Sequence, residues 1–158
     1  MRTAPPLALL ALLAAGCADA PEPAAAPPLS PAPPASATAL AAADAYARAA
    51  PAGGVSAVFF RLENGTATAD TLVAARTDAA SRVEVHEATE DADGLRGMRE
   101  VGRVAVPAGG AVALEPGGLH VMLLDLRRDL VEGDTLDVAL DFSGGPALDL
   151  RVPVRGLQ

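Results

Sequence analysis

The chain has few of the side chains on which many binding and catalytic sites depend. Its 158 residues include no tryptophan, no lysine, one cysteine, one tyrosine and three phenylalanines. The one cysteine, Cys17, lies close to the N-terminus. The chain therefore cannot form an internal disulfide, and everything beyond Cys17 lacks a thiolate for a metal centre.

Basic charge is also scarce. The 12 basic residues, all of them arginine, are outnumbered by 20 acidic ones, which gives a net charge of −8. Proteins that bind nucleic acid usually present a basic surface, so this balance argues against nucleic acid as a partner. The sequence also has no Gly-x-Ser-x-Gly or other nucleophile motif, and we expect no enzymatic activity.

Residues 1–16 have the layout of an export signal. One positive charge, at Arg2, precedes an apolar stretch over 4–15 that is too short for a bilayer, which needs about 20 residues. The following Ala-Ala-Gly-Cys17 resembles the bacterial lipoprotein cleavage box, with Ala in the first position instead of the usual Leu. This resemblance implies lipidation of Cys17 and predicts a membrane-anchored lipoprotein in a periplasmic or other extracytoplasmic location. The alternative is an ordinary signal peptide cut near Ala18 or Ala20, which would discard Cys17.

A tether rich in alanine and proline is predicted over 17–41. It contains seven of the chain's 14 prolines and shows no apolar periodicity. In a polyproline conformation, with a rise of ~3.1 Å per residue, it would reach up to ~70 Å. The remaining residues, 42–158, are predicted to form the folded domain.

Apolar residues in this domain alternate mainly with a period of two, which indicates β-strands. Turn signals such as Asn64-Gly65 and Asp93-Gly94 separate the alternating runs. Segment 39–50 is rich in alanine, which favours helix, but it also fits an edge strand, and we favour the strand. Many short strands with Gly/Pro turns predict an all-β fold, an antiparallel β-sandwich or barrel. The other predicted strands cover 55–62, 72–76, 82–86, 101–106, 111–114, 119–126, 135–142 and 147–154.

The histidines and methionines beyond the export signal form one pattern. His86, Met98, His120 and Met122 are the only residues of these two types apart from Met1. Eleven residues separate the first two, 21 residues the next two, and one residue the last two. Soft thioether sulfur selects Cu(I) over hard cations, so this set of donors predicts a Cu(I) site.

His120 and Met122 lie two residues apart on a predicted strand. Side chains at this spacing share one face, with their backbones ~6.7 Å apart. Leu119, Val121 and Leu123 then face the core. This alternation allows both donors to approach one ion.

The other two candidates come from neighbouring segments. The alternation over 82–86 places Glu84 and His86 on one face, and we expect His86 to project outward at the end of this strand. Met98 is expected just before the next strand. A hairpin that turns at Asp93-Gly94 would bring Met98 back near His86.

The four residues match the signature of the PCuAC-type periplasmic copper chaperones, which this chain resembles. That signature is His, an optional Met, ten residues, Met, 21 residues, His, any residue, Met; Glu87 stands here in the optional Met place. The resemblance covers roughly Asp44 to Val154, and the sequences around the candidate ligands also match. These are Val83–Glu87, Val106–Gly110, Glu115–Leu123 and Leu130–Thr135.

The resemblance implies a cupredoxin-like β-sandwich, or Greek-key barrel, that binds one Cu(I) ion. Its ligands would be His86, Met98, His120 and Met122. It further implies delivery of copper to the CuA centre in the copper-accepting subunit of respiratory cytochrome oxidase. We expect a monomer.

Two other functional classes are compatible with the sequence. A copper buffer or resistance protein would bind the ion without a dedicated acceptor. A metal-free interaction sandwich would carry the four residues by coincidence. An electron-transfer cupredoxin is disfavoured, because a blue copper site needs a cysteine thiolate.

Overall fold

A computed structural model describes residues 39–90 and 92–156. The predicted export signal (1–16), the lipidation site Cys17 and nearly all of the predicted tether lie outside the described residues. The described part is built from ten strands, and no helical segment in it has the length and apolar character that crossing a bilayer requires. The strands are β1 (Leu40–Arg48), β2 (Ser56–Asn64), β3 (Asp70–Arg76), β4 (Ala80–Glu90), β5 (Arg96–Glu100), β6 (Val104–Val106), β7 (Ala111–Leu114), β8 (Leu119–Leu126), β9 (Thr135–Phe142) and β10 (Leu148–Arg155).

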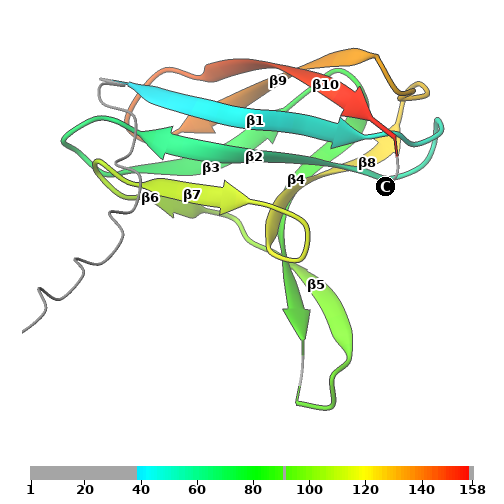
Figure 1. The fold of residues 1–158 in the computed structure, drawn as a ribbon, viewed down its shortest axis with the longest axis horizontal. Coiled ribbons are helices and arrows are strands. Elements are labelled where there is room, and N and C mark those ends of the chain that lie inside the picture. The colour runs from blue at the N-terminus through cyan, green and yellow to red at the C-terminus, as the bar shows by residue number, and fades with distance from the viewer. Residues whose placement is uncertain (1–38, 91, 157–158) are drawn as a thin grey trace, which may run out of the picture. The chain divides into compact units, whose positions relative to one another are not determined.

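Hydrogen bonds join the strands into one sheet (Figure 1). Its order is β5-β4-β8-β7-β2-β1-β10-β9-β3-β6, with a further pairing of β8 with β2. Most neighbouring strands pair antiparallel, as expected, but β1 pairs with β10, and β7 with β8, in parallel. Strands β1 and β10 come from opposite ends of the domain, and the β7–β8 contact consists of one residue pair, Leu114 with Leu119.

The two halves of the sheet share one apolar core. Alternate residues of β9, such as Leu136 and Leu140, are at most 2% exposed, and so are Val58 and Leu62 of β2. All four belong to a single cluster of buried side chains. The sheet therefore packs on itself as a sandwich, and the predicted all-β fold is confirmed.

The alanine-rich segment near the start of the domain is a strand, as we favoured. Strand β1 pairs with β2 over most of its length and with β10 at its C-terminal end. These tertiary hydrogen bonds outweigh the helix propensity of alanine. The register shifts between Ala43 and Tyr46, where Asp44 has a φ of 55°.

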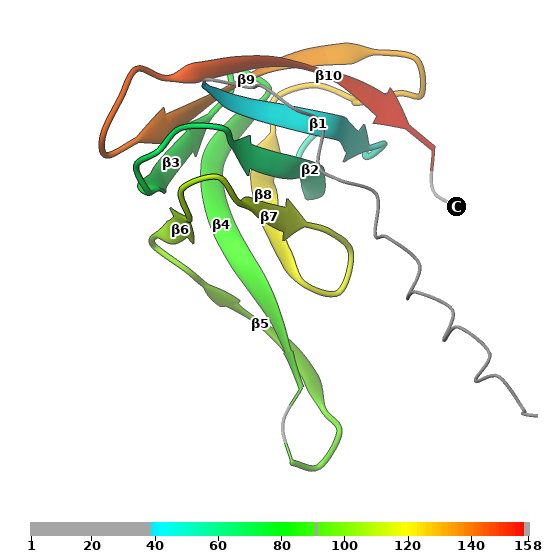
Figure 2. The same ribbon diagram turned by 60° about the vertical axis from the view of Figure 1, so that its left-hand side comes forward.

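The C-terminal part of β4 and all of β5 form a projecting hairpin that the sequence did not fully predict. Both views show this hairpin, called here the β4–β5 arm (residues 87–90 and 92–100), extending away from the other strands (Figures 1 and 2). Gly94, with a φ of 78°, lies in its turn, as the Asp93-Gly94 signal indicated. Strand β5 was missed because all five of its residues are exposed, so its sequence shows no buried face.

Candidate metal centre

Strand register places three of the four candidate ligands together. His86 of β4 lies directly opposite His120 of β8, and Glu84 lies opposite Met122. Opposed residues of an antiparallel pair point to the same side of a sheet, as do residues two apart on one strand. His86, His120 and Met122 therefore share one face.

Met98 joins this face from the arm. It lies opposite Ala88 in the β4–β5 pair, and Ala88 is two residues beyond His86 on β4. The predicted return of the chain through Asp93-Gly94 therefore brings Met98 to the side of the sheet that carries His86. Met98 lies inside β5 and not before a strand, and 57% of it is exposed.

The opposite face of the same strands packs into the core. Val121 and Leu123 are fully buried, and Val85 is 8% exposed. The predicted alternation on β8, in which candidate ligands alternate with core residues, is thus confirmed. The core side fixes the backbone from which His86 and His120 project.

His120 is held on two sides. The residue is 7% exposed, and its ring lies 6.1 Å from the ring of Phe59 and 6.1 Å from that of His86, measured between centroids. Its Nδ1 is 3.1 Å from the carbonyl oxygen of Gly118, to which it donates a hydrogen bond. This contact leaves the Nε2 lone pair of His120 available to a metal.

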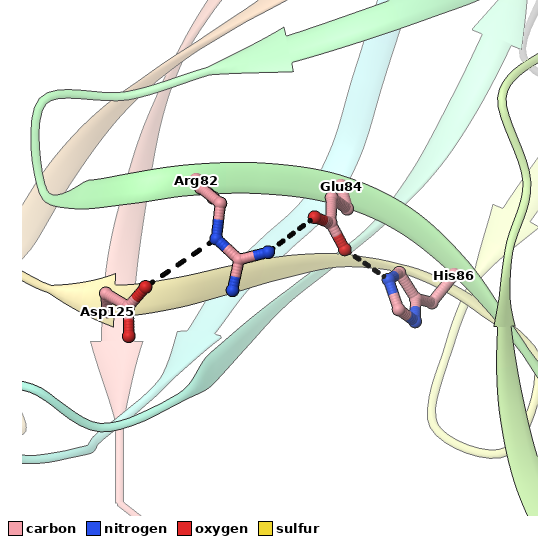
Figure 3. Close-up of polar contacts among 4 residues, drawn as sticks. All are labelled: Arg82, Glu84, His86 and Asp125. Atoms are coloured by element: carbon pink, nitrogen blue, oxygen red, sulfur yellow. Dashed lines mark hydrogen bonds and ion pairs between the residues drawn. The ribbon is translucent and has the colours of Figure 1, made fainter.

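His86 is placed differently from the prediction. Strand β4 continues to Glu90, so His86 lies within a strand and not at its end, and its side chain is only 15% exposed. Its Nε2 is 2.8 Å from Oε2 of Glu84 (Figure 3). Its Nδ1 is the one buried side-chain nitrogen or oxygen without a hydrogen-bond partner among residues 39–90 and 92–156. A buried acceptor left without a partner is costly, and a metal ion would satisfy it.

A cleft opens beside these residues. It has a volume of about 510 Å³, and Met98, His120 and Met122 all line it. Phe59, Val55 and Pro116 contribute apolar wall, and Arg48 lies at its border. These three candidate donors can therefore be reached from solvent on the side where Met98 is exposed, whereas His86 is not among the residues that line the cleft.

Clusters of histidine, cysteine and carboxylate side chains offer no competing site in the described part of the chain. There, no group of three or more His, Cys, Asp or Glu side chains is arranged to hold a metal ion. The site proposed from sequence contains only two such residues, His86 and His120, and depends on thioethers for its other donors.

Phe59 and Arg48 are two neighbours of the site that were not identified from sequence. Phe59 packs against His120 and is itself covered by Arg48, whose guanidinium carbon lies 5.2 Å from the centre of the phenyl ring. Ala57 pairs with Met122, which puts Phe59, two residues on, on the same face. Only the register of β2 with β8 reveals this. Glu84 did carry a signal, because the alternation of β4 already placed it beside His86.

Comparison with known proteins agrees with this architecture. Residues 40–154 match the model of the family described as "Putative lipoprotein LpqE-like". A protein of Leifsonia xyli subsp. xyli named "Putative lipoprotein Lxx21020" is 35% identical over 107 residues, which cover 67% of this chain and 64% of that protein. The chain thus spans less than two thirds of the length of this curated relative.

Solved structures show the same fold. The solution structure of the Cu(I) form of DR1885 from Deinococcus radiodurans has 30% identity and a TM-score of 0.57, covering 75% of this chain and 81% of that one. The apo PCuAC domain from PmoF1 has 23% identity and a TM-score of 0.64, covering 75% and 94%. The copper-bound PCuAC domain from PmoF2 has 18% identity and a TM-score of 0.62, covering 75% and 93%. The last two similarities concern the fold alone. With a PCuAC-type fold and a family match that runs from β1 to β10, the chain belongs to the LpqE-like lipoprotein family.

Proposed function

We propose that this protein is an extracytoplasmic carrier of Cu(I) that binds one ion through His86, Met98, His120 and Met122. The observation that carries the proposal is the strand register, which gathers these four side chains on one face of β5, β4 and β8. They are the only histidines and methionines of the described part of the chain. Two imidazoles and two thioethers make a donor set that suits Cu(I).

The hydrogen bonds of the two rings support this proposal. Histidines that bind metals usually donate their other ring N–H to a carbonyl or a carboxylate. His120 donates to the carbonyl of Gly118, and His86 to the carboxylate of Glu84. Each ring therefore keeps one nitrogen for an ion.

Similar proteins support copper as the cargo. The relative of 30% identity from Deinococcus radiodurans was solved with Cu(I), and the PmoF2 domain of the same fold was solved with copper. Their copper argues for the same ion here because this chain supplies a soft donor set in the same fold.

The donor set suits a carrier better than a permanent store. Thioethers have no proton to lose and bind Cu(I) less tightly than thiolates, which would oxidise outside the cytoplasm. Met98, which is 57% exposed, gives the bound ion one side that a partner can reach. We therefore propose transfer of Cu(I) to the copper-accepting subunit of cytochrome oxidase, at its CuA centre, and no catalysis by this protein.

Lipid attachment at Cys17 would keep the carrier at a membrane. The family and the Leifsonia xyli relative are both described as lipoproteins, which supports this part of the proposal. Mass spectrometry of the protein purified from membranes tests it. A mature N-terminus beyond Cys17, without a lipid, would exclude the anchor.

X-ray absorption on the Cu(I)-loaded protein tests the ligand set. We expect two sulfur and two nitrogen neighbours around one copper ion. Competition against a Cu(I)-specific chelator should show tight Cu(I) binding. A separate titration with Zn²⁺ should show weak binding, because zinc disfavours thioethers. Tight zinc and feeble Cu(I) binding would reject the proposal.

A transfer experiment separates a carrier from a copper buffer. The loaded protein is mixed with the apo CuA domain of an oxidase, and copper is measured on each partner after they are separated. Movement of copper faster than its spontaneous release supports a carrier. Movement no faster than release into a chelator would indicate a buffer or resistance protein.

A further inference from the structure

The two histidines of the site do not present the same nitrogen. A carbonyl oxygen only accepts hydrogen bonds, so the contact with Gly118 requires the proton of neutral His120 on Nδ1. An ionised carboxylate also only accepts, so the contact with Glu84 requires the proton of neutral His86 on Nε2. The free lone pair is therefore on Nε2 in His120 and on Nδ1 in His86.

The environment of His86 agrees with this assignment. Its Nδ1 is buried and has no hydrogen-bond partner among the described residues. If the proton were on Nδ1, the ring would bury an unpaired donor and would face the carboxylate of Glu84 with a second acceptor. Both changes are unfavourable, so Glu84 selects the tautomer.

Glu84 is itself held in place by a chain of ionic contacts. Its Oε1 is 3.2 Å from Nη1 of Arg82, and Nε of Arg82 is 3.6 Å from Oδ2 of Asp125 (Figure 3). The side chains become more buried toward the histidine, from 65% exposed at Asp125 and 61% at Arg82 to 23% at Glu84 and 15% at His86. Exposed ion pairs are weak, so the inner contact of Glu84 with His86 should dominate.

We propose that Glu84 is a positioning residue that makes His86 bind Cu(I) through Nδ1, while His120 binds through Nε2. This inference rests on the proposed function, because it concerns the same site. Arg82 acts one step further out and orients the carboxylate of Glu84. Partners of this kind typically change metal affinity 10- to 100-fold when they are removed.

Glu84 could instead be a surface carboxylate that pairs with His86 without affecting the metal. Glu87 supplies the matched control for this possibility. It is the sequence neighbour of His86, has the same charge and forms an ion pair with Arg99 at 2.6 Å, but its strand position points it to the other face. Glu87→Ala therefore removes the same charge and one ion pair without touching the His86 ring.

The first experiment needs no copper. Nitrogen-15 NMR of the apo protein, at a pH where both imidazoles are neutral, identifies the protonated nitrogen of each ring. We expect the proton of His86 on Nε2 and that of His120 on Nδ1, and a change to mixed tautomers for His86 in Glu84→Ala but not in Glu87→Ala. A proton on Nδ1 of His86 in the wild-type protein would overturn the inference.

The second experiment adds Cu(I), which is diamagnetic and so leaves the spectra readable. We expect the Nδ1 resonance of His86 and the Nε2 resonance of His120 to shift on binding. Chelator competition should show that Cu(I) affinity falls about 10- to 100-fold in Glu84→Ala, less in Arg82→Ala, and stays unchanged in Glu87→Ala. Equal affinities of Glu84→Ala and Glu87→Ala would refute the role of Glu84 while the copper site stands. Failure of the wild-type protein to bind Cu(I) would refute the proposed function, whatever the tautomers are.

Discussion

The β4–β5 arm and the rest of the sheet, called here the sheet body, contribute differently to the candidate site. The body supplies His86, His120 and Met122 from strands whose other face is packed into the core, with Val121 and Leu123 fully buried beneath them. The arm supplies Met98 from a strand in which all five residues are exposed. Buried packing restricts the candidate ligands of the sheet body, whereas the arm has no such packing on either face.

This difference assigns affinity for the ion to the sheet body and exchange of the ion to the arm. A preorganised group of donors provides affinity, because little order must be gained when the ion binds. An exposed donor on a projecting hairpin can leave the ion and let a partner's ligand replace it. A carrier needs both properties, since it must hold Cu(I) and also release it.

The largest effect is expected from a substitution that disrupts the packing of the sheet body. Leu123→Ala removes a fully buried side chain beneath the site and should lower the free energy of unfolding by about 2–5 kcal/mol. The same change on the arm, Leu95→Ala, affects a residue that is 72% exposed and should stay within about 0.5 kcal/mol. Urea denaturation of both variants measures the contrast. Similar losses in the two variants would contradict the assignment of stability to the body.

The second-largest effect is expected when a candidate ligand of the sheet body is removed. In the proposed site His120 contacts the ion directly, so His120→Ala should lower Cu(I) affinity by more than the roughly 100-fold that marks the upper end for outer partners. Chelator competition gives the affinity, and far-UV circular dichroism checks that the strands persist. If the folded variant keeps its affinity for Cu(I), His120 is not a ligand.

The two methionines allow a direct comparison of body and arm. Met122→Leu and Met98→Leu each remove a thioether and keep an apolar side chain of similar size. We expect about a tenfold loss of Cu(I) affinity for Met98→Leu, about 1.4 kcal/mol, and a larger loss for Met122→Leu. If the arm ligand is the one exchanged, Met98→Leu should speed transfer to an acceptor more than Met122→Leu does, relative to the affinity that each variant loses. Equal effects of both changes on affinity and transfer would erase the distinction.

The smallest effect concerns the half of the sheet that carries no candidate ligand. There the backbone N–H of Thr71 donates a 2.7 Å hydrogen bond to Asp70 and is the main cause that lowers the pKa of this carboxyl, with help from Gly144 and Ser143. Because the pKa is lower in the folded protein, the stabilising contribution of Asp70 is present above its unfolded pKa of about 3.9. It is lost as the pH falls through the folded value.

Asp70→Asn should therefore make the loss of stability in acid less steep and leave Cu(I) affinity at neutral pH unchanged. Urea midpoints measured from about pH 6 to about pH 3, below the unfolded pKa, test the first expectation. Chelator competition tests the second. An acid profile identical to that of the wild-type protein would show that the hydrogen bonds to Asp70 do not favour its ionised form.

Local patterns predicted strands β8 and β9 well because each alternates between a buried face and a more exposed one. The alternation over Thr135–Phe142 predicted β9 with its bounds, and that over Leu119–Leu126 predicted both β8 and the shared face of His120 and Met122. Strand β5 shows the opposite case. With no side chain in contact with the core, its sequence contains nothing that distinguishes a strand from a loop.

The amino-acid sequence by itself determined the inventory of this protein: an all-β domain whose only soft donors are two histidines and two methionines, at spacings that resemble a copper-chaperone signature. The tertiary structure decided how those donors meet. Residues as far apart as His86 and His120 become direct neighbours because strand register is set by hydrogen bonds and core packing between distant segments. The tertiary structure also leaves Met98 on an exposed arm, which no local pattern of residues specifies, whereas the alternation of β4 already placed Glu84 on the face of His86.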